Sequence, residues 1–361
     1  MMAKRVPIDT YCEKKIPTLQ KTYDGLIDYV DISSVDNTEK KIISYQTIES
    51  TDAPSRAKQL LQKGDVLVST VRPNLNAVAV VEEETENLMV GSTGYCVLRC
   101  KDNMDVRYLF NFCQSQYFVD DMSSQATGAS YPAVSNGIVR SALIPCCSIE
   151  EQREIAEKMD TVSELLALRK QQLAELDELI KSRFIELFGD PIRNTQNRPT
   201  TDFINVVKMQ RGFDLPVQDR QQDGDIPVFG SNGALDRHNV AKVQGGGVIT
   251  GRSGTIGKVY YTEGDYWPLN TSLFSVDMHG NDIIYLAYLL QLYDLSRFTE
   301  GTGVPTLNRN KFHDKPIIDV PLNEQEQFAV FVKQTDKSKL AVQQSIAELE
   351  ELKKSLMQQY F

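Results

Sequence analysis

Polar and cationic side chains suited to hydrogen bonding with nucleic-acid bases gather in two sets of predicted loops. Arginine can donate two hydrogen bonds to guanine, asparagine can pair with adenine, and serine or threonine can reach phosphates and bases. The first set comprises Arg56, Thr70, Arg72, Asn74, Asn76, Tyr131 and Asn136. The second comprises Arg211, Ser231, Asn232, Arg252, Ser253, Lys258, Asn270, Thr271, Thr302 and Asn308. A turn-forming or solvated role is the more common one for any single residue of this kind. The prediction of DNA contacts therefore depends on the two sets lying in equivalent positions.

The glycine-rich segment 251–258, Gly-Arg-Ser-Gly-Thr-Ile-Gly-Lys, does not have the spacing of a phosphate-binding P-loop. A P-loop has four residues between its glycines and a serine or threonine after its lysine, whereas here five residues intervene and valine follows Lys258. Two interpretations remain open. The segment is either a structural hairpin between strands or a backbone loop that carries Arg252 and Lys258 to DNA.

The sequence contains no catalytic or metal-binding constellation. His238, His279 and His313 are scattered, and the six cysteines all precede residue 148 without zinc-site spacing. We find no nucleophile elbow, no dinucleotide fingerprint and no Asn/Asp-Pro-Pro-Tyr stretch of the kind that amino-methyltransferases use. We therefore expect a chain that is not an enzyme, that has no catalytic residue, bound cofactor or metal, and that keeps its cysteines reduced in the cytoplasm.

Two long runs, over residues 148–188 and 324–361, contain no proline or glycine, and both carry apolar residues at heptad spacing. These runs must position the loops. An apolar seam of this period requires a partner helix along its length. At about 1.5 Å per residue the first helix would span roughly 55–60 Å, which is typical of a spacer. The predicted seam residues are Met159, Val162, Leu166, Leu173, Leu176, Ile180 and Leu187 in the first run, and Val342, Leu349, Leu352 and Leu356 in the second.

The two halves of the chain resemble each other. Residues 174–182 match 347–355 almost letter for letter, and the offset stays near 173–180 residues through both halves. Two unrelated amphipathic helices are the alternative, which the matched openings, lengths and aromatic ends disfavour. We predict an α+β fold in which two mixed, mainly β domains are separated by two long helices that form an antiparallel coiled coil, with a pseudo-twofold repeat. The expected boundaries are 1–147, 148–190, 191–323 and 324–361.

Within the domains the patterns predict individual elements. In the first half we expect strands over 26–32, 66–71, 77–81 and 95–98, a helical turn over 55–61 and a helix over 106–117. In the second half we expect strands near 224–233 and 245–252 and a helix over 283–293.

Composition describes a globular protein of two domains, with 361 residues, 41% hydrophobic and 24% charged. No apolar run approaches the roughly 20 residues of a membrane helix, and the first residues do not have the apolar core of a signal peptide. Residues 150–190 carry 6 basic and 11 acidic side chains, so half of the net charge of −10 lies on one predicted helix. The globular parts are near neutral, and we expect any DNA affinity to need help from a partner.

Several stretches together resemble the specificity subunit of type I restriction–modification enzymes. In the first half they are Ala-Pro-Ser-Arg-Ala at 53–57, Lys-Gly-Asp-Val-Leu at 63–67 and Thr-Val-Arg-Pro-Asn at 70–74. In the second half they are Arg-Gly-Phe at 211–213, the stretch 226–233 and the glycine-rich stretch 251–257. The Glu-Gln openings of both long runs also match, and the likeness covers nearly the whole chain.

The resemblance implies a non-catalytic reader of double-stranded DNA. Each globular domain would be a target recognition domain for one half of a gapped, bipartite sequence, and the paired helices would set the gap. Methyltransferase subunits, commonly two, would dock on the helices and domains, and restriction subunits would join them. S-adenosylmethionine, ATP and magnesium would be held by those partners.

Two alternatives differ in class. One is the recognition part of a single-chain restriction–methylation enzyme, which normally carries a methyltransferase domain that this sequence lacks. The other is a coiled-coil scaffold or adaptor whose two domains bind other ligands and have no DNA role. Salt-dependent DNA binding in the presence of a methyltransferase would separate these alternatives from the reader.

Overall fold

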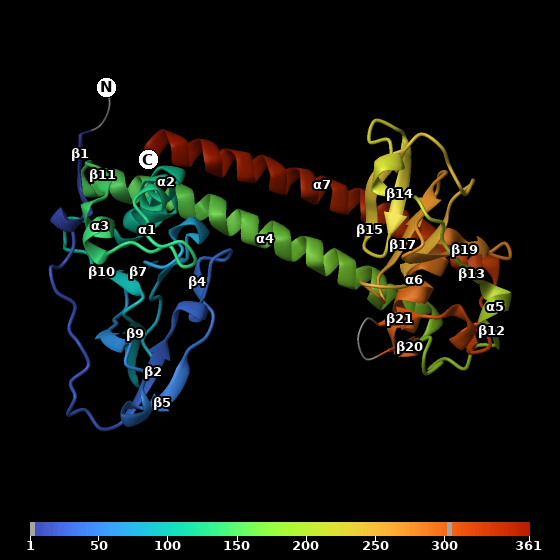
Figure 1. Ribbon diagram of the computed structural model, residues 1–361, viewed down its shortest axis with the longest axis horizontal. Coiled ribbons are helices and arrows are strands. Elements are labelled where there is room, and N and C mark those ends of the chain that lie inside the picture. The colour runs from blue at the N-terminus through green and yellow to red at the C-terminus, as the bar shows by residue number, and fades with distance from the viewer. Residues whose placement is uncertain (1–3, 302–304) are drawn as a thin grey trace. The chain divides into compact units, whose positions relative to one another are not determined.

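The computed structural model describes residues 4–301 and 305–361 and divides the chain into two compact units (Figure 1). Unit 1 consists of Met1–Arg169 and Ser345–Phe361, and unit 2 consists of Lys170–Gln344. Two long helices, α4 (Ile149–Phe188) and α7 (Leu322–Tyr360), each belong to both units. The fold is of the α+β class, as predicted. No helix within the described residues is long and apolar enough to cross a membrane.

The two larger sheets of unit 1 are flanked by short helices, and β1-β11 and β3-β4 form two-stranded sheets beside them. Of the larger sheets, one has the order β5-β2-β9-β6, in which β2 and β9 are parallel, and the other has the antiparallel order β10-β7-β8. Its main core lies between the second sheet and the helices. The bounds are β1 (Arg5–Pro7), β2 (Leu26–Val30), β3 (Val35–Asp36), β4 (Lys41–Ile42), β5 (Gln46–Glu49), β6 (Ala57–Leu60), β7 (Val66–Ser69), β8 (Val78–Val80), β9 (Leu88–Ser92), β10 (Tyr95–Leu98), β11 (Leu143–Pro145), α1 (Val106–Gln114), α2 (Gln116–Ser124) and α3 (Asn136–Ser141).

The expected helical turn over 55–61 is wrong, because this segment contains strand β6. The strand pairs with β9, and the side-chain amide of Gln59 donates to the carbonyls of Ser92 and Tyr95 at 2.8 and 2.9 Å. These long-range contacts outweigh the local helical preference of the segment.

The expected helix over 106–117 is interrupted. Ser115 has an extended backbone, and its Oγ accepts a hydrogen bond of 3.2 Å from the N–H of Phe118. Ser115 therefore ends α1 and caps a second helix, α2.

Unit 2 contains a four-stranded antiparallel sheet, β13-β19-β16-β17, a second sheet, β15-β14-β18, and a buried helix, α6. The core lies around α6 and the ends of α4 and α7 that belong to this unit. Helix α6 begins and ends where the sequence predicted. The bounds are β12 (Thr200–Asp202), α5 (Phe203–Val206), β13 (Lys208–Arg211), β14 (Ile226–Gly230), β15 (Gly233–His238), β16 (Gly247–Gly251), β17 (Val259–Thr262), β18 (Trp267–Pro268), β19 (Ser272–Asp277), α6 (Ile283–Tyr293), β20 (Thr299–Glu300), β21 (Thr306–Leu307) and β22 (Pro316–Ile318).

A buried glutamine joins the start of each long helix to its unit. The Oε1 of Gln152 accepts from the backbone N–H of Asp105 at 2.8 Å, and the Oε1 of Gln325 accepts from the backbone N–H of Asp282 at 2.9 Å. Each aspartate is the N-cap of a core helix, α1 or α6. Each glutamine also donates to a backbone carbonyl five residues before it. The Glu-Gln openings thus provide one hydrogen-bonding arrangement in both units.

An aromatic residue joins the end of each long helix to the other unit's core. In unit 1 the rings of Phe361 and Tyr108 lie 5.2 Å apart, and in unit 2 the rings of Phe188 and Tyr285 also lie 5.2 Å apart. All four side chains are buried. Each long helix therefore begins on one unit with a glutamine and ends in the other with an aromatic side chain.

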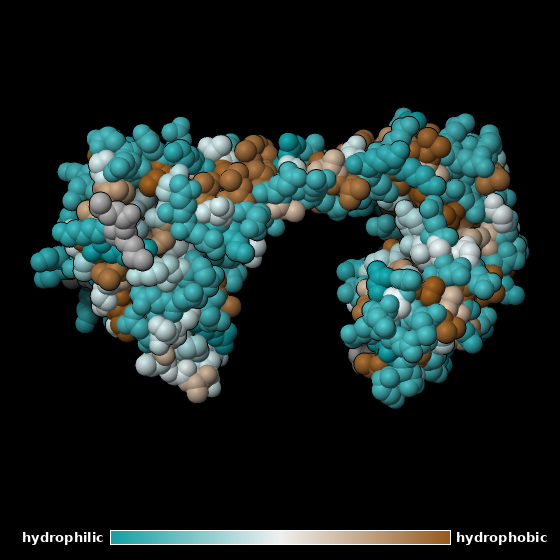
Figure 2. Space-filling model, turned by 90° about the horizontal axis from the view of Figure 1, so that it is seen from above, coloured by the Kyte–Doolittle hydropathy of each residue, from teal (hydrophilic) through white to brown (hydrophobic). Residues whose placement is uncertain are grey.

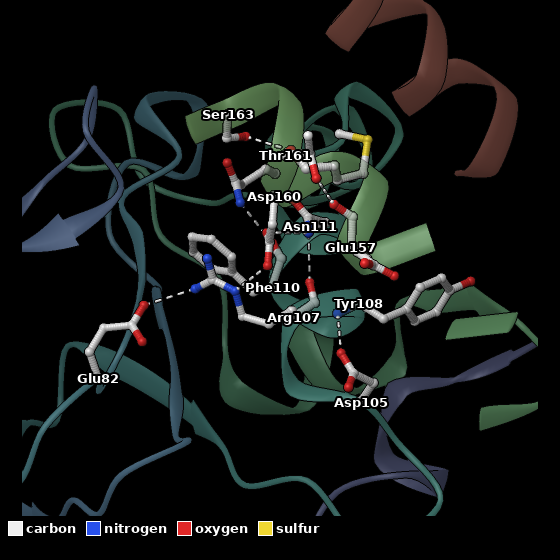
Figure 3. Close-up of polar contacts among 12 residues, drawn as sticks. Glu82, Asp105, Arg107, Tyr108, Phe110, Asn111, Glu157, Asp160, Thr161 and Ser163 are labelled. Atoms are coloured by element: carbon white, nitrogen blue, oxygen red, sulfur yellow. Dashed lines mark hydrogen bonds and ion pairs between the residues drawn. The ribbon is translucent and has the colours of Figure 1, made fainter. Parts of the chain in front are cut away.

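Polar contacts also attach α4 to α1 within unit 1 (Figure 3). The guanidinium of Arg107 lies 2.8 Å from carboxylate oxygens of both Asp160 and Glu82. The amide of Asn111 donates to the backbone carbonyl of Arg107 at 2.9 Å and to Asp160 at 3.4 Å. The start of α4 is thus an integral part of unit 1.

Within unit 2, the segments of α4 and α7 run in opposite directions. The Nζ of Lys339 lies 2.6 Å from Asp177, and the ring of Phe328 lies 5.4 Å from that of Phe184. Residue numbers thus rise along α4 as they fall along the neighbouring part of α7.

Most of the predicted seam residues are sheltered from solvent, but Leu352 is a correction. It is 45% exposed, because a step of four residues from Leu349 brings Lys353 to the sheltered side of α7. The buried seam residues are Met159, Val162, Leu166, Ile180 and Val342. The half-buried ones are Leu173, Leu176, Leu187, Leu349 and Leu356.

Replacing Phe328 with alanine is expected to destabilise unit 2 strongly. The side chain is fully buried and its ring lies within 6 Å of those of Phe184, Phe188 and Tyr288. Removal of such a ring leaves a cavity and costs about 3–5 kcal/mol of unfolding free energy, which urea denaturation measures. The control is Leu340→Ala on the same helix, where the side chain is 67% exposed and the expected change is within about 0.5 kcal/mol. Equal losses would contradict the packing described.

Candidate nucleic-acid interface

Three of the predicted DNA-binding residues of unit 1 meet at one pocket. Arg56, Arg72 and Tyr131 line a cavity of about 750 Å³ whose other described lining residues are mostly apolar. The guanidinium of Arg72 lies 4.7 Å from the ring centroid of Tyr131, in the geometry of a cation–π contact. None of the described lining residues carries a carboxylate. The pocket therefore presents two cations and one aromatic face, which suit phosphate, guanine and base-stacking contacts.

The loop that carries Arg72 and Asn74 is a short 3-10 turn between two residues with left-handed backbone. Arg72 has φ 50° and Asn76 has φ 47°, and Pro73 begins the turn. The N–H of Arg72 donates to the carbonyl of Pro132 at 2.7 Å. Left-handed conformations cost non-glycine residues roughly 1–2 kcal/mol each, so surrounding contacts must hold this loop. It leaves the Arg72 and Asn74 side chains exposed.

Three other predicted residues of unit 1 have different surroundings. Thr70 is buried and its hydroxyl donates to the carbonyl of Gly94 at 2.9 Å, so it contributes to the core in this structure, and its contact with DNA stays a prediction. The side-chain oxygen of Asn76 is buried and has no hydrogen-bond partner among the described residues. Asn136 is exposed at the first turn of α3 and does not line the pocket. Of the predicted residues of unit 1, Arg56, Arg72, Asn74 and Tyr131 are the exposed ones on or beside the pocket, and Asn136 is exposed elsewhere.

In unit 2 the glycine-rich segment 251–258 connects β16 and β17 as a hairpin loop. The N–H groups of Arg252 and Ser253 both donate to the carbonyl of Thr271, at 2.8 and 3.2 Å. The carbonyl of Arg252 accepts from the N–H of Leu307 at 2.8 Å. The backbone of this segment therefore forms a hairpin loop. The same hydrogen bonds fix the position of the Arg252 backbone, from which its side chain projects.

Glycine is required where this loop approaches its neighbours. A Cβ atom on Gly251 would collide with the carbonyl oxygens of Thr255 and Ser231. Gly254 has φ +87°, and a Cβ there would lie 3.3 Å from the hydroxyl of Ser231. The close approach brings Ser231 beside the loop.

Lys258 and Asn232 are brought together by the same loop. The Nζ of Lys258 donates to the Oδ1 of Asn232 at 3.2 Å, and the hydroxyl of Tyr260 lies 3.5 Å from the same oxygen. Burial raises the pKa of Tyr260, so its phenol is neutral and acts as a donor. Lys258 and Asn232 are both exposed and available to a ligand.

Asp214 adds a carboxylate to this surface that the sequence did not predict. The side-chain amide of Asn270 donates a hydrogen bond to this carboxylate, and the backbone carbonyl of Asn270 accepts a long bond of 3.5 Å from Arg252. Asp214 can accept hydrogen bonds, and its negative charge repels phosphate. No sequence motif marked this residue.

The remaining predicted residues of unit 2 are dispersed. The side chain of Asn308 accepts from the N–H of Asn310 and caps a 3-10 turn, which is a turn-forming role. Arg211 is exposed on strand β13. Thr302 lies outside the described residues.

A second groove of unit 1 has the opposite charge. It has a volume of about 700 Å³, and its lining includes five carboxylates and a single lysine among the described residues. Burial opposes ionisation of one of them, Asp28, but hydrogen bonds from Thr47 and Asn87, at 2.6 and 3.2 Å, lower its pKa. This groove repels phosphate, whereas the Arg56–Arg72–Tyr131 pocket attracts it.

Known proteins resemble this chain in sequence and in fold. A family model described as the type I restriction modification DNA specificity domain matches residues 9–178 and 193–351. The chain is similar to the HindI specificity subunit of Haemophilus influenzae, with 25% identity over 47% of this chain and 38% of that protein. It is also similar to the MjaVIII specificity subunit of Methanocaldococcus jannaschii, with 21% identity over 44% of this chain and 39% of that protein. The matched regions thus span about two fifths of these curated relatives.

Solved structures share the fold along the whole chain. A chain from a study of complex assembly and conformational transition of the type I R-M system covers 99% of this chain and 97% of its own length, with a TM-score of 0.65 and 23% identity. The S subunit of a type I restriction-modification system from M. genitalium covers 99% and 96%, with a TM-score of 0.63 and 15% identity. The family match covers both units, and the resemblance of the sequence is confirmed. The chain belongs to the family of type I restriction modification DNA specificity domains.

Proposed function

We propose that this chain is the non-catalytic DNA specificity subunit of a type I restriction–modification complex and that each unit reads one half of a bipartite, gapped target. The observation that carries the proposal is the meeting of Arg56, Arg72 and Tyr131 at a pocket whose described lining has no carboxylate. Guanidinium groups make the commonest specific contacts to guanine in the major groove and also neutralise phosphates.

The second reading surface is the loop of unit 2 around Arg252. Its backbone is fixed by hydrogen bonds to Thr271 and Leu307, and Lys258 and Asn232 lie together on its exposed side. A rigid loop that presents a cation and an amide can hold both a phosphate and a base edge. We assign the second half-site to this surface.

The two long helices are proposed to act as the spacer between the half-sites. In this proposal residues 1–147 and 191–323 are the target recognition domains, and 148–190 and 324–361 pair as an antiparallel coiled coil. The equivalent anchors at Gln152 and Gln325 support a pseudo-twofold repeat. A helix of fixed rise is suited to setting a fixed distance along DNA.

Methyltransferase subunits, two in the simplest arrangement, are proposed to dock on the helices, and restriction subunits to join them. Hydrophobic side chains remain at the surface of the helical segments (Figure 2). They include Leu165 and Leu168 in unit 1, and Leu179, Val330 and Leu340 in unit 2, all more than 40% exposed. Exposed apolar residues of this kind mark protein interfaces. S-adenosylmethionine, ATP and magnesium would be held by the partners, and the complex would act in the cytoplasm.

The test is a genome-wide map of adenine methylation in source cells with and without this gene. We expect a gapped, two-part methylation motif that disappears on deletion. The chain is then combined with its methyltransferase, and binding to the mapped target is measured against scrambled DNA at several salt concentrations. Specific binding that weakens steeply with salt is expected. Equal affinity for target and scrambled DNA would contradict the proposal and favour a scaffold.

A further inference from the structure

Three residues with left-handed backbone meet beside the reading pocket of unit 1. Lys40, Arg72 and Asn76 have φ 56°, 50° and 47°, and the described residues contain only four other non-glycine positions of this kind. Such conformations persist only where the surroundings impose them, and they concentrate at functional sites. Two of the three, Arg72 and Asn76, bound one loop and the third, Lys40, contacts it, so surrounding contacts must hold this loop in place.

The hairpin between β3 and β4 supplies the contacts that hold this loop. The Nζ of Lys40 donates to the backbone carbonyl of Asn76 at 2.5 Å, and the amide of Asn37 donates to the carbonyl of Leu75 at 3.4 Å. The hairpin is itself fixed, because the carboxylate of Asp36 accepts from two backbone N–H groups in its turn. The hairpin thus forms hydrogen bonds with the last two residues of the loop that presents Arg72.

We propose that Lys40 is a positioning residue for DNA recognition by unit 1, and that its ammonium group holds the Arg72–Asn76 loop in the conformation that presents Arg72 and Asn74. The inference rests on the proposed reading role of this loop. Lys40 is half-buried and bonded to a backbone carbonyl, so it acts through the loop and not by contact with DNA.

The charge of Lys40 depends on pH within an accessible range. Burial and the ammonium of Lys353 on α7 lower the pKa of Lys40 to about 8, against the opposing effect of Asp36 in its own hairpin. An ammonium donates a stronger hydrogen bond than a neutral amine. The hydrogen bond from Lys40 to the carbonyl of Asn76 therefore weakens as pH rises through 8. The stability of the fold changes in the opposite direction. Because the pKa of Lys40 is lowered in the folded chain, the unfolded chain binds this proton more tightly, and the folded state becomes more stable as pH rises above about 8.

The experiment measures affinity of the reconstituted methyltransferase complex for its gapped target from pH 7 to pH 9. We expect Lys40→Met to weaken binding roughly tenfold at pH 7 and to flatten the pH profile. Lys40→Arg should restore affinity and keep it up to pH 9, because guanidinium does not titrate there. The matched control is Lys41→Met, which removes the same charge from an exposed neighbour and should behave as wild type. Wild-type affinity and pH dependence in Lys40→Met would overturn the proposal, as would an equal loss in Lys41→Met.

A second measurement does not depend on DNA. Amide hydrogen exchange of the peptide covering residues 70–78 is compared in wild type, Lys40→Met and Lys40→Arg. The N–H groups of Leu75 and Asn76 donate within the turn at 2.9 and 3.0 Å, so release of the loop should speed their exchange in Lys40→Met alone. If wild type binds no target specifically but the exchange difference is present, the proposed function fails and the positioning role stands. Unchanged exchange would contradict the positioning role itself.

Discussion

Replacing Arg72 with alanine is expected to abolish discrimination at one half-site and to leave the other half-site readable. A bidentate arginine–guanine pair contributes about 1–3 kcal/mol of discrimination, so methylation of the cognate target should fall roughly tenfold to hundredfold. Alanine pays a steric penalty similar to that of arginine at φ 50°, so the loop should keep its backbone. Methylation of a library with every base of the target varied measures which positions become degenerate.

Arg252→Ala provides the reciprocal experiment in unit 2. It should relax the half-site opposite to that affected by Arg72→Ala, because the two arginines belong to different units. Arg193→Ala is the neutral control. The Arg193 side chain is 82% exposed and its ion pair with Asp190 is long at 3.9 Å and solvated, so it contributes little. Loss at both half-sites from either Arg72→Ala or Arg252→Ala would count against one reading surface for each unit.

Periodicity and repetition predicted the long helices well because those features are local. Heptad spacing marks one face of a helix whatever the fold, and most residues chosen for that face are sheltered. In the sequence alone, the Glu-Gln openings are only matching letters. The structure explains them, because Gln152 and Gln325 each satisfy the N-cap backbone of a core helix while buried.

The reading surface could be predicted only in part because its geometry depends on contacts distant in sequence. Threonine can reach phosphates and bases, but the residues after β7 bring the hydroxyl of Thr70 to the carbonyl of Gly94. Asp214 and Lys40 carry no motif, and each acquires its role from a residue more than 30 positions away. Residue type identifies groups that can bind a base, whereas tertiary packing decides which of them face a ligand.

Lengthening both long helices by one heptad is expected to change the gap in the target and nothing else. Seven residues inserted after Arg169 in α4 and seven after Gln344 in α7 fall at the boundary between the units, and seven residues preserve the phase of the seam. The added rise is roughly 10 Å, or about 3 base pairs at about 3.4 Å each. The methylated motif should therefore keep both half-site sequences, gain a longer gap, and no longer include the wild-type target.

The control separates length from mere insertion. The same seven residues placed after Gln222, in the exposed turn before β14, should leave the gap as it is in wild type. An altered half-site sequence with an unchanged gap would refute the spacer role of the helices. A complex that methylates no sequence would point instead to lost folding, which urea denaturation detects. Because the two outcomes involve different measurements, the spacer is tested independently of the reading residues: Arg72 and Arg252 determine which bases are read, and the helices determine how far apart those bases lie.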